Sequence, residues 1–145
     1  MKILIAFDNS TASREAMKFA LKLKPVVDEY LIVYVTPTVV GAGPTFDSYV
    51  PPSVYVKQEE SADKVIKEAK ELVEPENINA RFLQLDASGD QVANVMIRTA
   101  RENNVDLIIT GTRKLSGLSK VLLGSVSSEL VKISHIPVLV APPPQ

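Results

Sequence analysis

The feature that most constrains this chain is its alternation between short apolar runs and longer stretches of helical periodicity. Mostly apolar runs at residues 3–7, 31–35, 105–109 and 137–140 are typical of strands that are covered on both faces. Residues 80–85 alternate between apolar and polar side chains, which predicts a more exposed strand.

Between these runs, apolar residues recur at the spacing of one helix face. The four expected stripes are Ala12, Ala16, Phe19, Ala20 and Leu23; Ala62, Val65, Ile66, Ala69, Leu72 and Val73; Val92, Met96, Ile97 and Ala100; and Val126, Leu130 and Ile133. We expect Pro25 to limit the first helix, because the residue before a proline is disfavoured in helical conformation. Strands alternating with helices predict an α/β fold with a doubly wound parallel sheet, helices on both faces and right-handed crossovers. The 145 residues fit a single domain, 1–145.

Residues 36–56 do not fit a compact strand–helix unit. They contain several turn-forming residues, no usable periodicity and three of the eight aromatic residues: Pro37, Gly41, Gly43, Pro44, Pro51 and Pro52, with Phe46, Tyr49 and Tyr55. A structureless segment of about 20 residues in a small domain is uncommon. Two interpretations stay open: a lid or partner-contacting arm, and an excursion without a function.

Composition excludes several classes of protein. The chain contains no Cys and one His, which excludes disulfides, thiolate catalysis, zinc–cysteine centres and poly-histidine metal sites. Sixteen Lys and Arg against 17 Asp and Glu give a net charge of −1, without the basic surplus that nucleic acids or anionic membranes attract. No apolar run approaches the ~20 residues that span a bilayer. We therefore expect a cytoplasmic protein with neither a nucleic-acid nor a membrane partner.

Candidate ligand-binding residues follow three of the expected strands, where ligands bind to open α/β sheets. They are Asp8 to Ser10, Val35 to Thr36, and Thr110-Gly111 together with Gly124-Ser125 at a helix start. A helix N-terminus offers N–H groups to an anion, and glycine allows close approach. The alternative interpretation makes Ser125 and Asp8 helix caps, Asp8 for a helix beginning around Ser10–Thr11.

Four segments together resemble the universal stress protein family, in the right order and over essentially the whole chain: residues 3–10, 105–111, 124–127 and 136–140. Nucleotide-binding members of that family carry Gly, two residues, Gly, nine residues, Gly, then Ser or Thr. Gly111 and Gly124-Ser125 stand at matching positions with the spacing intact, and Lys114 replaces the middle glycine.

The resemblance implies a five-stranded sheet in the order 3-2-1-4-5 and a homodimer joined through the last strand, Pro137 to Val140. It also implies an adenine nucleotide, ATP or AMP, with Mg²⁺ as a possible companion. By matching position, Asp8 would meet the ribose, Val35 the adenine, and Gly111, Gly124, Ser125 and Ser127 the phosphates. The full set of nucleotide-contacting residues implied is Ala6, Phe7, Asp8, Val35, Gly111, Lys114, Gly124, Ser125, Val126 and Ser127.

Lys114 leaves two hypotheses open. Its ammonium group either acts as an extra cation for the phosphates or obstructs the site. The corresponding functions are an adenine-nucleotide-binding regulatory module of the stress response, acting as a homodimer, and a nucleotide-free dimeric interaction protein of the same fold. We assign no catalytic and no metal-ligating residue, and expect slow ATP hydrolysis at most, because no general base stands near a γ-phosphate.

Overall fold

The computed structural model describes residues 1–38, 51–114 and 121–143. Its main sheet contains five parallel strands in the spatial order β3-β2-β1-β4-β7. The strands are β1 Lys2–Ala6, β2 Glu29–Thr36, β3 Ala80–Asp86, β4 Leu107–Gly111 and β7 Val138–Ala141. Counted along this sheet, the order is 3-2-1-4-5, which confirms the expected fold class.

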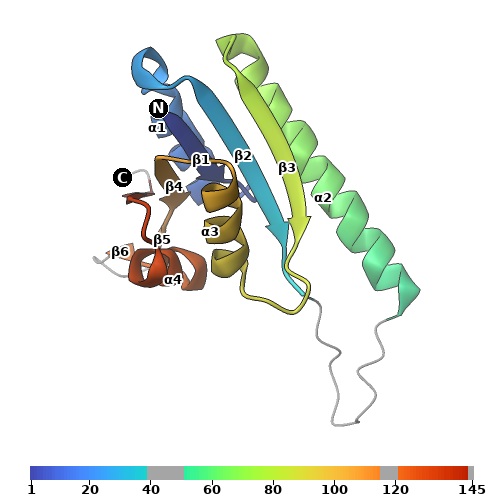
Figure 1. Cartoon of the computed structure of the whole chain (residues 1–145). Helices are drawn as coiled ribbons and strands as arrows, with labels where there is room; N and C mark the ends of the chain where they lie inside the picture. Colours follow the sequence, from blue (N-terminus) through green and yellow to red (C-terminus); the bar gives the residue numbers. More distant parts are fainter. Residues whose placement is uncertain (39–50, 115–120, 144–145) are drawn as a thin grey trace.

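Helices cover both faces of the sheet (Figure 1). Helices α1 (Thr11–Leu21) and α2 (Pro52–Val73) pack on one face, and α3 (Val92–Glu102) and α4 (Ser125–Ile133) pack on the other. No helix in the described part of the chain is long and apolar enough to cross a membrane.

The central strand β1 divides the apolar core into two layers. Ile3, Leu4 and Ile5 are all fully buried, but they point alternately to opposite faces because side chains alternate along a strand. Leu4 belongs to the core under α3 and α4, whereas Ile3 and Ile5 belong to the core under α1 and α2. This arrangement explains why the run is apolar throughout.

Polar contacts join the helices to the sheet and to one another. The hydroxyl of Tyr30 donates a hydrogen bond to the Ala20 carbonyl, 3.1 Å away, within the core. An ion pair of 3.0 Å between Arg14 and Glu68 connects α1 to α2. Lys70 Nζ lies 5.7 Å from the centroid of the Phe82 ring on β3.

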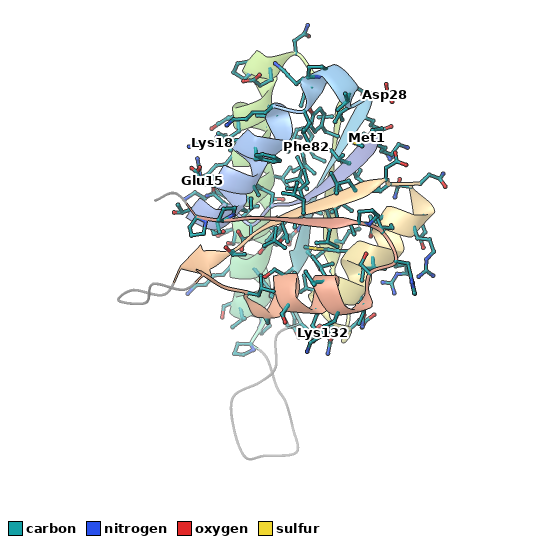
Figure 2. All side chains as sticks on the ribbon, turned by 90° about the vertical axis from the view of Figure 1, so that its left-hand side faces the viewer. Met1, Glu15, Lys18, Asp28, Phe82 and Lys132 are labelled. Carbon is teal, nitrogen blue, oxygen red and sulfur yellow. The ribbon has the colours of Figure 1, made fainter. Side chains whose placement is uncertain are left out.

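The outer surface of α1 is polar. Figure 2 shows Glu15 and Lys18 on this helix away from the sheet, where their side chains form a 2.8 Å ion pair. The pair is three residues apart, the spacing that brings side chains together on one helix face.

Two residues expected to face the core are partly exposed. Phe19 is 38% exposed and Ile133 is 40% exposed. Both lie near helix C-termini, Ile133 being the last residue of α4. Helix α1 also ends at Leu21, before Pro25, which lies in the 3₁₀ helix Lys24–Val26; a second 3₁₀ helix covers Glu74–Glu76.

The segment expected to be structureless is shorter than residues 36–56. Strand β2 continues through Thr36, and α2 already begins at Pro52, a proline position that suits the first helical turn. Tyr55 is therefore helical, and it is 55% exposed. Residues 39–50, to which the lid, arm and excursion interpretations refer, lie outside the described residues.

A small antiparallel ribbon was not expected. Strands β5 (Arg113–Lys114) and β6 (Val121–Leu122) pair with the register Arg113↔Leu122 and Lys114↔Val121. Two-residue strands are too short for periodicity to indicate them.

Candidate functional site

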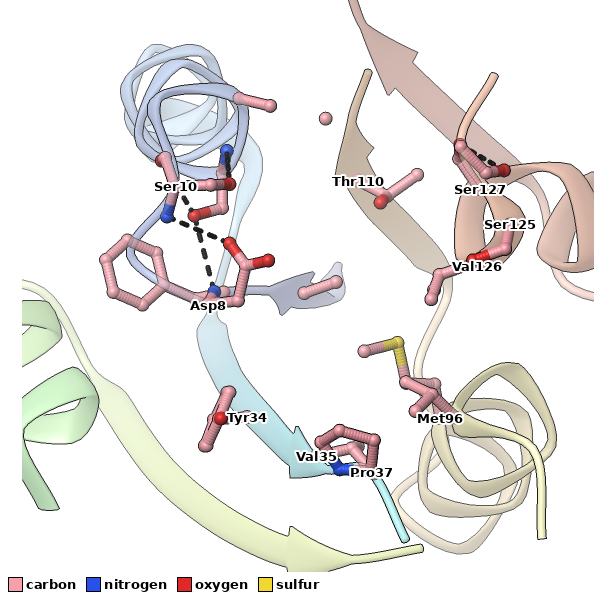
Figure 3. Close-up of a pocket in the computed structure, with 17 residues that line it drawn as sticks. Asp8, Ser10, Tyr34, Val35, Pro37, Met96, Thr110, Ser125, Val126 and Ser127 are labelled. Atoms are coloured by element: carbon pink, nitrogen blue, oxygen red, sulfur yellow. Dashed lines mark hydrogen bonds between the residues drawn. The ribbon is translucent and has the colours of Figure 1, made fainter. Parts of the chain in front are cut away.

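A cleft of about 520 Å³ opens at the carboxyl ends of β1, β2 and β4 (Figure 3). Helices α1, α3 and α4 supply the rest of its wall. The lining residues are Ala6, Phe7, Asp8, Ser10, Ala12, Ser13, Tyr34, Val35, Pro37, Val92, Met96, Thr110, Gly111, Gly124, Ser125, Val126 and Ser127. Strand ends of an open parallel sheet are the usual ligand position in this class of fold.

The cleft brings together the sequence-derived candidates except Asn9, Thr36 and Lys114. The backbone of Lys114 lies in β5, opposite Val121, and its side chain is outside what the structure describes. A strand position is extended, a conformation that any residue adopts. The lysine that replaces the family's glycine therefore has no need of left-handed backbone geometry.

The turn between β1 and α1 holds Asp8 at the mouth of the cleft. The Ser10 N–H donates to Asp8 Oδ1 at 2.9 Å, and the Ser13 N–H donates to Ser10 Oγ at 3.1 Å. Ser10 is thus the N-cap of α1, which corrects the alternative that assigned the cap to Asp8. Between them, Asn9 has φ of 66°, and its Oδ1 accepts a 2.9 Å hydrogen bond from Arg14 Nε.

The start of α4 differs from the expected cap. Gly124 is the N-cap, and Ser125 is already the first helical residue, so the interpretation of Ser125 as N-cap is wrong. Gly124 has no side chain with which to cap the helix. The Ser128 N–H donates a hydrogen bond of 2.9 Å to the Gly124 carbonyl at the start of the helix. The preceding N–H groups of the first turn have no acceptor within the helix, as at every helix N-terminus.

Gly111 is required by packing at the end of β4. A Cβ atom at this position would lie 2.3 Å from the Ala12 carbonyl oxygen in the first turn of α1. No real contact is that short, and the obstacle is backbone that cannot rotate away. Gly124 is different, because its nearest neighbour would be Ser127 Oγ at 3.9 Å.

The two walls of the cleft differ chemically. In Figure 3, Asp8, Ser10 and Tyr34 lie on one side, and Met96 and Val126 lie across from them. On the opposite wall, Val92 and Met96 of α3 and Val126 of α4 are apolar, which suits a flat apolar ring. The same wall becomes polar at the start of α4, where Ser125 and Ser127 also line the cleft.

Sequence reasoning missed several lining residues, among them Tyr34 and Met96, whereas it did identify Thr110. Met96 was assigned to the core stripe of its helix, and it is indeed only 5% exposed while also lining the cleft. Thr110 precedes Gly111 and is 5% exposed. Strand-end position was the signal available for Tyr34, since it lies two residues before the last residue of β2.

The surroundings of Tyr34 in the cleft change the pKa of its hydroxyl. Partial burial raises the pKa of the Tyr34 hydroxyl, and the negative charge of Asp8 raises it further, while the Thr36 hydroxyl acts in the opposite direction. The phenol is therefore protonated at neutral pH. Among the described residues, no group of three or more His, Cys, Asp or Glu could hold a metal ion.

A family model and the curated relatives of this chain indicate the same protein family. The model of the universal stress protein family matches residues 1–142. A universal stress protein of Methanocaldococcus jannaschii is 32% identical over 146 residues, covering 99% of this chain and 83% of the relative. One from Bacillus subtilis is also 32% identical, covering 96% of this chain and 97% of the relative.

Solved structures share the fold. A universal stress protein family member from Burkholderia pseudomallei superposes with a TM-score of 0.76 at 24% identity, covering 99% of this chain and 96% of that one. A family member from Arabidopsis thaliana with AMP bound gives 0.70 at 15% identity, covering 99% and 92%. A universal stress protein in complex with cAMP gives 0.65 at 16% identity, covering 99% and 98%.

The two glycines of the cleft provide a matched test of packing. We expect Gly111→Ala to lower the free energy of unfolding by about 2–3 kcal/mol, because the added methyl group overpacks against the α1 backbone. Gly124→Ala should cost less than about 1 kcal/mol, since the space is open and only the N-cap preference changes. Urea unfolding of both variants measures the difference; equal losses would contradict the packing role of Gly111.

Proposed function

This chain belongs to the universal stress protein family, and we propose that it binds an adenine nucleotide, AMP or ATP, in the cleft above β1, β2 and β4. The observation that carries the proposal is the composition of this one cleft. An apolar wall, an exposed carboxylate and an uncapped helix N-terminus surround about 520 Å³. Those three surfaces suit a base, a sugar and a phosphate in turn.

The apolar end of the cleft would hold the base. Ala6 and Val35 lie at the ends of adjacent strands, and Met96 and Val126 face them from α3 and α4. All four belong to or pack against the same buried core, so this end is rigid and largely dry. Burial of a planar ring against apolar side chains supplies most of the affinity in such pockets.

The polar end would hold the sugar and the phosphates. Asp8 accepts hydrogen bonds through a carboxylate, which suits ribose hydroxyl groups and repels phosphate. The start of α4, with Gly124, Ser125 and Ser127, offers N–H groups and hydroxyls to an anion. A nucleotide would then lie with its base toward α3 and its phosphates toward α4.

We propose that the bound nucleotide regulates the protein and is not a substrate that the protein converts rapidly. The structural neighbours with AMP bound and in complex with cAMP show that proteins of this fold accept adenine nucleotides. No residue of this chain is assigned as a general base, so we propose a cytoplasmic homodimer whose nucleotide state governs its contacts in the stress response. Mg²⁺ would accompany ATP through its phosphates.

Ligand analysis tests the proposal directly. We expect near-stoichiometric adenine nucleotide in the mass spectrum of ligand released from the purified protein, and calorimetric binding of AMP and ATP to the stripped protein. GMP is the control, because the same phosphate and sugar then carry a different base. A folded protein that releases no nucleotide and binds neither AMP nor ATP would favour the nucleotide-free interaction protein.

Lys114 is proposed as an additional phosphate-binding cation. Its extended backbone in β5 carries no left-handed strain, so a lysine fits the backbone at this position. We expect Lys114→Gln and Lys114→Gly to bind ATP about three- to tenfold more weakly, with a smaller salt dependence, since a charge-assisted hydrogen bond is lost. AMP binding should change less. Lys132→Ala, on the exposed part of α4, is the control, and a gain in ATP affinity at position 114 would show obstruction.

A homodimer through the last strand is proposed from the edge position of β7. In the described sheet, β7 pairs with β4 alone. The carbonyls of Pro137 and Ala141 accept hydrogen bonds from the β4 side, so by alternation the backbone groups of Val138 and Val140 face outward. Pairing of this edge with its copy about a two-fold axis would satisfy them.

A single backbone substitution tests the dimer. Val140→Pro removes an outward-facing N–H without removing a hydrogen bond to β4, and proline is tolerated on edge strands. We expect the wild-type protein to sediment as a dimer at micromolar concentration and the variant to shift toward monomer. Val140→Ala keeps the N–H and should remain dimeric. A monomeric wild-type protein, or a Val140→Pro variant that stays dimeric with its circular dichroism unchanged, would refute this interface.

A further inference from the structure

Tyr34 occupies a position in the cleft that the nucleotide-contacting set does not include. It lies on β2, whose register with β1 pairs Ala6 with Val33, and the Phe7 N–H donates to the Val33 carbonyl at 3.0 Å. Tyr34, the next residue of β2, therefore lies beside Phe7. Phe7 in turn immediately precedes Asp8. Its side chain packs against the core under α1 and α2 and also lines the cleft.

Tyr34 and Asp8 lie on the same wall of the cleft. Figure 3 shows them on adjacent strand ends, facing Met96 and Val126 across the cavity. The two groups are close enough for the charge of Asp8 to raise the pKa of the Tyr34 hydroxyl. A neutral phenol, which can donate and accept, thus stands near a carboxylate, which only accepts.

The other hydroxyls on this wall are used by the turn itself. Ser13 Oγ donates to the Ser10 carbonyl at 3.0 Å and accepts the Asp8 N–H at 3.3 Å. Ser10 Oγ accepts the Ser13 N–H as the cap of α1. Tyr34 consequently supplies the hydroxyl on this wall that does not serve the capping turn.

We propose that Tyr34, together with Asp8, recognises the vicinal hydroxyl pair of a ribose and makes the site selective for ribonucleotides over deoxyribonucleotides. This inference rests on the proposed adenine-nucleotide function. Each ribose hydroxyl can donate to the Asp8 carboxylate, and an oxygen of the pair can accept from the Tyr34 hydroxyl. A deoxyribose lacks one of these partners, which leaves a polar protein group unpaired in a partly dry cleft.

The test compares AMP with its 2′-deoxy and 3′-deoxy forms, by calorimetry, on the natural protein and on Tyr34→Phe. The variant keeps the aromatic ring that packs against the core. We expect the natural protein to bind at least one deoxy form about three- to tenfold more weakly than AMP, the range expected for one lost hydrogen bond. In Tyr34→Phe this preference should become smaller, because AMP binding weakens while binding of that deoxy form is unchanged, and only the part that Asp8 supplies should remain.

Tyr55→Phe is the matched control, since Tyr55 is exposed and lies outside the cleft. It should keep the full preference for AMP. Equal weakening of AMP and both deoxy forms in Tyr34→Phe would overturn the inference, because a general loss of packing has that signature. So would a natural protein that binds all three nucleotides equally, with adenine binding itself intact. Failure to bind AMP at all refutes the proposed function instead, and this inference falls with it.

Discussion

Parallel pairing of β1 with two neighbours is the interaction on which the rest of the molecule depends. Hydrogen bonding to β2 on one side and β4 on the other places the ends of three strands at one edge of the sheet. The strand is fully buried over Ile3, Leu4 and Ile5, so both helix layers pack against it. The cleft lies where those three strands stop. The geometry of the cleft is therefore set by the buried strand β1 and its two neighbours.

The pattern of apolar residues predicted the fold class, because a strand buried on both faces gives a run with no polar positions, as at residues 3–7. The pattern did not predict burial correctly near helix ends, and it did not predict very short strands. Phe19 has the spacing of a core residue but is 38% exposed near the end of its helix, and β5 and β6 are too short to have a period. Residues 52–56 look like a turn-rich segment because prolines both break helices and begin them.

The site was less predictable than the fold, for a physical reason. Strand-end positions and the glycine spacing located most of the residues that line the cleft, but not the purpose of each one. Gly111 is demanded by the Ala12 carbonyl whether or not a ligand is present. Met96 and Tyr34 serve the core and the cleft together, and periodicity reports only the first role. A sequence shows that a residue is apolar, not that one edge of it faces a cavity.

Gly111 also has a place in the sheet that connects the cleft to its edge. It lines the cavity, touches the first turn of α1 and pairs with Ala141 of β7, while the next residue, Thr112, donates its N–H to the Ala141 carbonyl at 3.0 Å. Only one strand separates the cavity from the outermost backbone of the sheet. A ligand that displaced the end of β4 would have to move α1 and β7 with it. The end of β4 therefore joins the wall of the cleft to the sheet edge at which we propose that a second copy of the chain pairs.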